Sequence, residues 1–170
     1  MDAGDELVDV VDEHDVVVGT VTRRQVRAER LRHRSVAVAV IHPDGRLLVH
    51  RRSEAKDIWP GRWDLAVGGV VGAGESYAGA ARREAEEEVG IVGVELEEIG
   101  GGAYTDADVA MIGRCFRITH PGPFSFADGE VAEARWVTAA ELGAMRRAVP
   151  FVPDSVAVLL PLLAADFRTV

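Results

Sequence analysis

Three glutamates on one short stretch of the chain have the types and the spacing to bind a metal ion. Glu84, Glu87 and Glu88 lie within residues 69–91, which read GVVGAGESYAGAARREAEEEVGI. At about 100° per residue along a helix, the three carboxylates share an arc of roughly 100° on one side. They repel one another there, and carboxylates are the hard oxygen ligands that Mg²⁺, Mn²⁺ and Ca²⁺ prefer. The cluster therefore predicts a divalent metal site, with a solvated acidic helix face as the alternative.

The residues around these glutamates predict the helix that positions them. Ser76 suits an N-cap, Gly90 suits the position just beyond the C-terminus, and no proline stands between them. A narrow apolar stripe runs along the same helix through Ala78, Ala81, Ala85 and Val89. We therefore expect a loop followed by a helix that packs through its alanines, with the carboxylates beside the buried stripe.

The same segment fits the pattern G-x5-E-x7-R-E-U-x-E-E-x-G-U, in which U is an apolar residue. The fixed letters that match are Gly69, Glu75, Arg83, Glu84, Glu87, Glu88 and Gly90. With each letter at a background frequency near ~6–7%, a chance match at one position has a probability of about 10⁻⁸. The segment resembles the Nudix box, the signature of the Nudix hydrolase superfamily, and departs from it only in the small size of Ala85.

This resemblance implies roles for the matching residues. The implied ligands of Mg²⁺ or Mn²⁺ are Glu84, Glu87, Glu88 and the backbone carbonyl near Gly69. It also implies that Glu75 and Arg83 form a structural ion pair that braces the loop against the helix. These two residues would then orient the site rather than react.

The group that accepts a proton from the attacking water has two candidates. Hydrolysis of a diphosphate requires neutralised phosphate oxygens, a positioned water and a proton acceptor. One candidate is Glu84 itself. The other is Glu130, because residues 128–136 resemble the later loop and strand in which many Nudix hydrolases hold a further glutamate. The alternative for this second stretch is a set of surface charges before an edge strand.

A second resemblance concerns the basic residues near the box. Residues 8–74 are similar to type I isopentenyl diphosphate isomerases, which are Nudix-fold enzymes, in VDEHDVVVGTVTRR, LRHRSVAVAV, LLVHRRSEAK and WPGRW. The resemblance implies that Arg52 and Lys56 contact a diphosphate and that His33 helps to hold a metal. The alternative is a solvated strand end with a loop lysine.

The isomerase chemistry itself does not carry over. It needs a cysteine within residues 65–69, which read LAVGG, and two glutamates near residues 108–113, which read DVAMIG. The pattern that remains resembles the isomerase-like branch of Nudix hydrolases, and we favour a structural role for His33.

Composition limits the classes of function. The chain has 170 residues, of which 48% are hydrophobic and 28% charged, as is typical of one globular domain with a full core. Its net charge of −9 argues against nonspecific binding to nucleic acid or to an acidic membrane. A phosphorylated substrate would therefore need local positive charge, from metal or from a few Arg and Lys residues.

Cellular location is also constrained. Cys115 is the only cysteine, and its apolar surroundings suit a buried hydrophobe better than a nucleophile. The acidic start of the chain lacks the apolar region of a signal peptide, and no run approaches the 18 apolar residues of a membrane span. We therefore expect a cytoplasmic protein.

Outside the box, apolar runs and turn residues predict the elements that complete the fold. The predicted strands are 7–11, 16–21, 36–41, 47–52, 94–99, 111–118 and 131–137, with an apolar segment at 63–71. The predicted helices are 22–31, 138–145 and 155–164, the first two capped by Thr22 and Thr138. Strands and helices do not alternate as βαβ units, which favours a mixed sheet between helices.

The Nudix resemblance implies the same fold class, α/β (α+β): an α/β/α sandwich with the box as a loop-helix-loop at the edge of the sheet. We expect a single Nudix hydrolase domain over residues 1–170. Residues 1–31 form an N-terminal hairpin and helix extension, residues 34–150 the core, and residues 69–91 the box. The extension could also serve as the arm of a homodimer.

The function predicted is that of a metal-dependent hydrolase that cleaves a phosphoanhydride bond in a nucleoside diphosphate linked to another moiety. Its partner is thus a small phosphorylated molecule. The alternatives are an isomerase of prenyl diphosphates and a Nudix-like protein that senses a nucleotide without hydrolysing it. Substrate preference is expected in the loops 53–62, 100–108 and 121–129, where contacts of Trp59, Trp63 and Tyr104 with substrate stay open.

Overall fold

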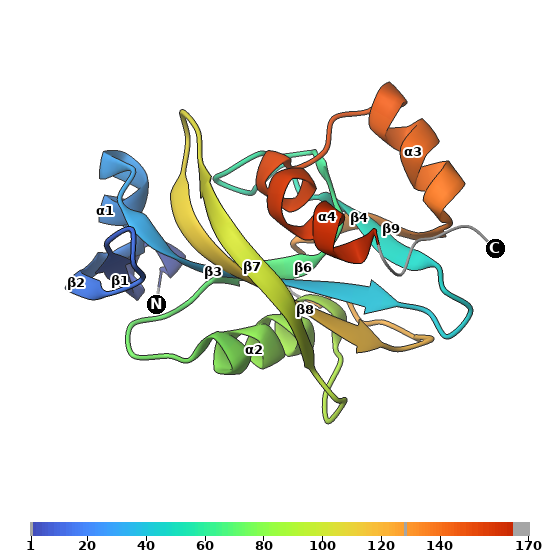
Figure 1. Ribbon diagram of the computed structural model, residues 1–170, viewed down its shortest axis with the longest axis horizontal. Helices are drawn as coiled ribbons and strands as arrows, with labels where there is room; N and C mark the ends of the chain where they lie inside the picture. The colour runs from blue at the N-terminus through green and yellow to red at the C-terminus, as the bar shows by residue number, and fades with distance from the viewer. Residues whose placement is uncertain (1, 128, 165–170) are drawn as a thin grey trace.

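A mixed β-sheet runs through the centre of the molecule and carries helices on both faces (Figure 1). The structure is a computed structural model that describes residues 2–127 and 129–164. Within these ranges nine strands form one sheet, whose main path has the order β2-β1-β3-β4-β5. The strands are β1 (Leu7–Val11), β2 (Val17–Thr22), β3 (Arg32–Ile41), β4 (Leu47–Arg52), β5 (Trp63–Asp64), β6 (Val67–Val70), β7 (Glu97–Thr105), β8 (Ala110–Thr119) and β9 (Val131–Val137). This arrangement confirms the predicted fold class.

Three of the helical segments in the described residues begin at the predicted caps Thr22, Ser76 and Thr138. The helical segments are the short 3₁₀ turn η1 (Ala3–Asp5), α1 (Arg23–Glu29), α2 (Tyr77–Val89), α3 (Ala139–Ala148), the π-helical turn η2 (Ser155–Leu159) and α4 (Leu160–Leu163). The side chains of Thr22, Ser76 and Thr138 each accept a hydrogen bond from a backbone N–H in the first turn of α1, α2 and α3. Gly90 ends α2 in the left-handed region with φ 72°, which costs glycine nothing.

Strand β3 decides which residues reach which face of the sheet. It pairs in parallel with β8 along its whole length and antiparallel with β6. Since side chains alternate in direction along a strand, Val36 and Val38 join the core under α2, whereas Ala39 joins the core under α4. The expected stripe of α2 lies in the first of these cores, with Ala80 buried as well and Ala78 only partly buried.

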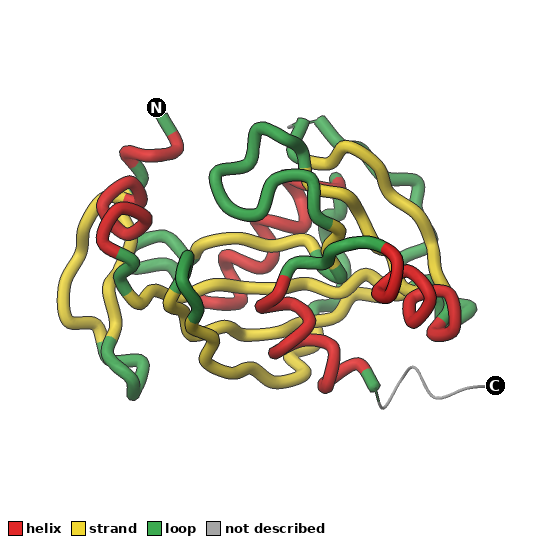
Figure 2. Tube along the Cα trace, turned by 90° about the horizontal axis from the view of Figure 1, so that it is seen from above, coloured by secondary structure: helices red, strands yellow, loops and turns green. Residues whose placement is uncertain are grey.

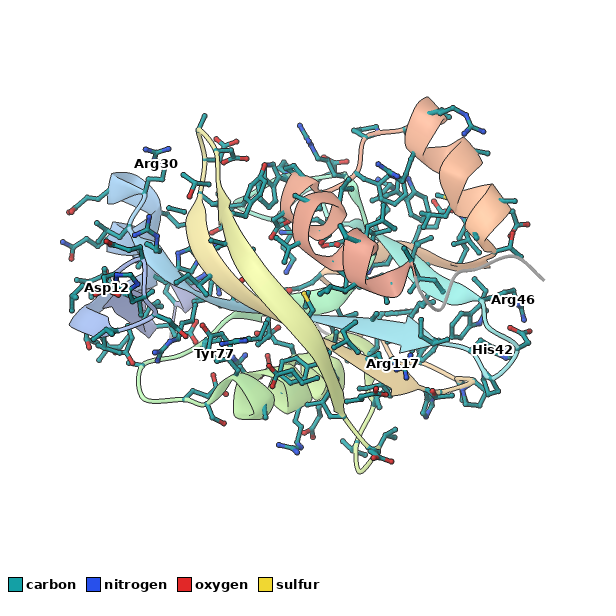
Figure 3. All side chains as sticks on the ribbon, viewed as in Figure 1. Asp12, Arg30, His42, Arg46, Tyr77 and Arg117 are labelled. Carbon is teal, nitrogen blue, oxygen red and sulfur yellow. The ribbon has the colours of Figure 1, made fainter. Side chains whose placement is uncertain are left out.

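The N-terminal hairpin and α1 form one end of the molecule, opposite α3 (Figure 2). A small apolar cluster of Val8, Val26 and Val70 joins β1 and α1 to β6. At the tip of the hairpin, Asp15 accepts a hydrogen bond of 3.0 Å from the hydroxyl of Tyr77, the first residue of α2 (Figure 3). The N-terminal hairpin and α1 are therefore attached to both ends of the box loop, at β6 and at α2.

Strand β7 differs from the sequence prediction. The predicted strand 94–99 begins later and runs through Glu97–Thr105, so most of the expected specificity loop 100–108 is strand. The glycines at its centre indicate close packing rather than a loop. A Cβ on Gly101 would collide with the backbone of Gly113 in the neighbouring strand β8.

Other boundaries shift for reasons that are not local. Strand β3 starts at Arg32, before the predicted range 36–41, because its first residues pair with β8. The apolar segment 63–71 contains two short strands that pair with different neighbours, β5 with β4 and β6 with β3. The predicted helix 155–164 begins as the π-helical turn η2 and continues as α4 around Pro161.

Close packing of β6 on β3 makes a test of this fold. A Cβ added at Gly68 would collide with the carbonyl oxygen of Val36 and lie 3.1 Å from the Cα of Ala37. Both atoms belong to the backbone of β3, which cannot move away because it is paired with β6. Gly68→Ala is therefore expected to lower the free energy of unfolding by about 1–3 kcal/mol, as overpacking of a core does.

Chemical denaturation measures this difference. The matched control is Gly19→Ala, on the exposed strand β2, where a Cβ would meet nothing within 4 Å. The control should keep or slightly raise stability, because alanine restricts the unfolded chain. Equal stability of the two variants would contradict the described packing of β6 on β3.

Candidate functional site

Helix α2 turns two of its glutamates inward and one outward. The side chains of Glu84 and Glu88 are 10% and 3% exposed, whereas that of Glu87 is 54% exposed. Glu84 lies against the backbone of β6, where an ideal Cβ on Gly69 would stand 2.5 Å from Glu84 Oε1. A side chain at position 69 would therefore push Glu84 out of this place. Gly69, Glu84 and Glu88 are the group on which the site is built.

Arg83 holds the loop before α2 against the helix. Its Nε and Nη2 donate to Glu75 Oε1 and Oε2 at 3.1 and 3.0 Å, and Nη2 also donates to the carbonyl of Val70 at 3.1 Å. Glu75 in turn accepts from the backbone N–H of Gly72 at 3.0 Å. The hydrogen bonds from Arg83 and Gly72 overcome the effect of burial and hold the pKa of Glu75 below its usual value.

The same arginine reaches the glutamates of the helix. Arg83 Nη1 lies 2.6 Å from Glu84 Oε1 and 3.4 Å from Glu87 Oε2. Burial raises the pKa of Glu84, and the charge of Arg83 opposes that rise. Arg83 is thus both a brace for the loop and the nearest counter-charge of Glu84.

Lys56 is the corresponding cation on the other side of the group. Its Nζ lies 3.6 Å from Glu88 Oε1 and forms a second, very short ion pair with Glu130. Burial raises the pKa of Glu88 well above its usual value, and Lys56 opposes the shift. At Glu130 burial is outweighed by the hydrogen bond from Lys56, which keeps the pKa of that carboxyl low. Asp128, at the start of the stretch 128–136, lies outside the described residues.

The residues present fit a divalent cation. Glu84 and Glu88 are buried carboxylates whose charged forms are disfavoured by desolvation, which a bound cation would relieve. Among the described residues no three His, Cys, Asp or Glu side chains already converge as a metal site. Glu84 and Glu88 would therefore supply the first two ligands. Further oxygens are available near Gly69, at Glu87 and at Glu130.

A pocket opens beside this group and is rich in basic side chains. The space that it encloses is about 820 Å³ when its open mouth is included. Gly68, Gly69 and apolar residues of β3, β6 and β8 form its floor. The basic residues that line it are Arg23 and Arg27 of α1, Arg52 at the end of β4, Lys56 and Arg114. Arg52 and Lys56 thus lie where a substrate phosphate could reach them.

Two residues of this lining, Arg23 and Arg27, are absent from the sequence prediction. We read residues 22–31 only as a polar helix that extends the core. Their spacing of i and i+4 places both on one face of a helix, and this was the available signal. That the face turns toward the box depends on the packing of Val26, between them, against Val8 and Val70.

A second acidic group closes the pocket on the side of η2. Ser155 Oγ donates to Asp64 Oδ1 at 2.6 Å, and Asp154 accepts from the backbone N–H of Ser155 at 2.8 Å. Arg52 Nη1 lies 3.8 Å from Asp64 Oδ2, and its Nη2 donates to the carbonyl of Ile58 at 2.9 Å. Burial raises the pKa of Asp154 to about 7, and the charge of Asp64 adds to the rise.

The remaining candidates divide into core and pocket mouth. His33 is buried in the pocket wall with Nδ1 3.0 Å from the carbonyl of Leu31, and burial lowers its pKa to about 4. Trp63 belongs to the core. Trp59 lines the pocket with φ 49° and meets Tyr104 edge-on, with ring centroids 6.4 Å apart. Arg51, near the end of β4, forms ion pairs with Glu54 in the turn that follows and with Glu133 on the neighbouring strand β9.

Known proteins are similar to this chain in sequence and in fold. Residues 31–158 match the model of the NUDIX domain family. The uncharacterized Nudix hydrolase YfcD of Escherichia coli K12 is 42% identical over 157 residues, which are 92% of this chain and 86% of YfcD. The crystal structure of DR0079 from Deinococcus radiodurans has a TM-score of 0.78 at 25% identity and covers 96% of this chain and 100% of its own.

A further solved structure is that of a complex with a nucleotide-like ligand. The NUDIX domain of Shewanella oneidensis NrtR, solved as a complex with ADP ribose, has a TM-score of 0.63 at 16% identity over 85% of this chain and 98% of its own. At this identity the likeness concerns the fold. In the described part of the chain, no helix has the length and apolar character needed to cross a membrane.

Asp154 makes the stability of the protein depend on pH. Its pKa of about 7 in the folded chain lies above the value of 3.8 expected when unfolded. The folded state thus holds the proton on Asp154 more tightly than the unfolded state does. The contribution of this carboxyl to the free energy of unfolding is therefore fully present below pH 3.8 and is lost as pH rises through about 7. Asp154→Asn removes this titration and keeps a side-chain oxygen for the N–H of Ser155.

We expect the variant to gain about 2 kcal/mol on wild type between pH 4 and pH 8, after allowance for partial exposure of the carboxyl. Urea denaturation of both proteins at several pH values measures the gain, and groups common to both cancel in the difference. Parallel curves for the two proteins would show that Asp154 titrates normally.

Proposed function

The chain belongs to the Nudix family, whose members hydrolyse phosphorus-containing anhydrides, and on that premise we propose that it cleaves a nucleoside diphosphate linked to another moiety. The observation that carries the proposal is the pairing of two environments. Buried carboxylates of α2 lie beside Gly69, and a pocket lined by Arg52 and Lys56 opens next to them. The first suits a hard cation and the second suits phosphate oxygens.

The cation proposed is Mg²⁺ or Mn²⁺, held by Glu84 and Glu88 with help from Glu87 and from the carbonyl near Gly69. When bound, it would act as a Lewis acid that neutralises charge on the diphosphate oxygens. The ion pair of Glu75 with Arg83 keeps the box loop in place beneath this site. Arg83 also accounts for the orientation of Glu84, whose Oε1 it contacts.

Arg52 and Lys56 are proposed to bind the diphosphate itself. Arg52 Nε is buried and has no hydrogen-bond partner among the described residues, so an incoming acceptor would satisfy it after a small movement. Lys56 lies between Glu88 and Glu130, close to where a phosphate would meet the carboxylates. Both cations also overcome the repulsion that a net charge of −9 imposes on an anionic substrate.

Glu130 is proposed as the general base, in preference to Glu84. Its pKa is lowered by Lys56, so the carboxylate is ionised at neutral pH and can accept a proton. Glu84 is instead wedged between Gly69 and Arg83. In the reaction, a water oxygen bonds to one phosphorus, the bridging P–O bond breaks toward the leaving phosphate, and the water proton passes to Glu130.

The likeness to isopentenyl diphosphate isomerases supports the diphosphate-binding residues more than the reaction. Residues 65–69 contain no cysteine, and Ala110 and Met111 of β8 are buried apolar residues where the isomerases use glutamates. We therefore extend the resemblance to substrate binding by Arg52 and Lys56 and not to protonation of an alkene.

A panel of phosphorylated compounds tests the proposal. Purified protein would be incubated with nucleoside triphosphates, ADP-ribose, NADH, dinucleoside polyphosphates, CoA and isopentenyl diphosphate, each with Mg²⁺, with Mn²⁺ and with a chelator. Metal-dependent release of a nucleotide or phosphate supports the hydrolase. Isomerisation of isopentenyl diphosphate would replace it with the isomerase, and nucleotide binding without turnover would replace it with a sensor.

Two substitutions on α2 separate the site from the general acidity of the helix. Glu88→Gln removes a buried carboxylate, whereas Glu86→Gln removes the same charge from an exposed position of the same helix. We expect the first to lower kcat/KM by at least ~100-fold, as loss of a group acting directly on the reaction does, and the second to leave it unchanged. Equal activity of the two variants would contradict the proposed role of Glu88.

A further inference from the structure

We infer that α1 adds a second anion-binding site to the pocket, in which Arg23 and Arg27 bind a further phosphate or carboxylate group of the substrate. The inference rests on the proposed function for the identity of the substrate, and it narrows that substrate to compounds that carry an anionic group beyond the diphosphate. Both arginines belong to the N-terminal extension, outside the residues 31–158 that match the family model.

Helix α1, which carries the two arginines, is held against the pocket by apolar packing. They are spaced i and i+4 on α1, and their side chains are 24% and 21% exposed. Val26 lies between the two arginines in the sequence and is buried against Val8 and Val70. Val70 is the last residue of β6 and directly follows Gly69. The arginines therefore cannot swing away from the strand that forms the pocket floor without breaking this apolar contact.

Arg24, on the same helix, has a different environment. Its side chain is 63% exposed and forms ion pairs with Asp2 at 3.0 Å and with Asp5 at 2.9 Å. The positive charge of Arg24 is therefore paired with these two neighbouring acids. The charge of Arg24 thus serves the N-terminal turn, while those of Arg23 and Arg27 face the pocket.

Arg23 and Arg27 each form one ion pair with an acid among the described residues. Arg27 Nε lies 3.3 Å from Asp57 Oδ2, and Arg23 Nη1 lies 3.5 Å from Glu6 Oε2, each a single long contact. Burial lowers the pKa of Arg27 despite Asp57, and the charges of Arg23 and Arg52 add to this effect. A protein of net charge −9 has gathered these cations at one place, where an anionic ligand would relieve their repulsion.

The position of this second site follows from the loop that joins it to the first. Lys56 contacts Glu88, and the next residue, Asp57, contacts Arg27. A substrate held at the α2 carboxylates would therefore extend along Lys56 toward α1. Guanidinium groups bind phosphate and carboxylate oxygens in two-point contacts, which fits an anionic group at the far end of such a molecule.

Binding of inorganic tripolyphosphate, with divalent metal removed by a chelator, tests the site without catalysis. We expect calorimetry to show that Arg23→Gln with Arg27→Gln weakens binding roughly tenfold or more, as loss of charge-assisted hydrogen bonds does. Arg24→Gln removes one positive charge from the same helix, as each of the single variants Arg23→Gln and Arg27→Gln does, and should alter binding by less than about twofold. Equal losses in both proteins, or no binding to wild type, would overturn the inference.

A second variant separates anion binding from a structural role of the ion pair. Asp57→Asn removes the partner of Arg27 and leaves the arginine in place. If Arg27 merely anchors the loop, this variant should lose as much affinity as Arg27→Gln. If Arg27 binds the anion, Asp57→Asn should bind tripolyphosphate as tightly as wild type or more tightly, because a competing carboxylate is gone.

The two proposals fail in distinguishable ways. Arginine-dependent binding of tripolyphosphate without turnover of any phosphorylated compound would retain the anion site and reject the hydrolase. Turnover by wild type with no effect of the double arginine variant on tripolyphosphate binding would retain the hydrolase and reject the anion site. With a substrate in hand, the double variant should raise KM for compounds bearing the extra anionic group and leave kcat unchanged.

Discussion

Burial of two like charges on one helix is the constraint on which the rest of the structure depends. Glu84 and Glu88 are one turn apart on α2 and face the sheet, where isolated carboxylates would be strongly disfavoured. Arg83 and Lys56 stand on opposite sides of the pair and offset that cost. Small residues of α2 and the glycines of β6 let the helix approach closely enough for this arrangement. Charge and packing are therefore set together.

Much of this region could be predicted from the sequence because its rules are local. The caps of α2, the left-handed Gly90 and the placing of Glu84 and Glu88 on one side of the helix all follow from helix geometry over a few residues. The same geometry placed Glu87 in the acidic arc. Its outward direction depends on where the sheet lies relative to the helix, which the helix alone does not specify.

What escaped prediction depends on contacts between distant segments. The direction of the Arg27 side chain depends on the packing of Val26 against Val70. The ion pair of Lys56 with Glu130 likewise joins residues that are far apart in the chain. The later part of strand β7 was missed because its glycines resemble a turn. Their close packing explains them: Gly101 lies against Gly113 of β8, whereas Gly100 and Gly102 lie against Leu162 and Val158. Propensity describes a segment by itself, whereas these features belong to pairs of segments.

The way the N-terminal hairpin and α1 attach to the box loop has an evolutionary consequence. The carboxylates stand on α2, while the two arginines stand on α1, a segment far from α2 in the chain that lines the same pocket. Mutations in α1 can therefore alter which molecules are admitted while the inherited hydrolytic centre stays intact. Substitutions at two partly buried positions of one short helix would thus be enough to diversify substrate choice among descendants of such a chain.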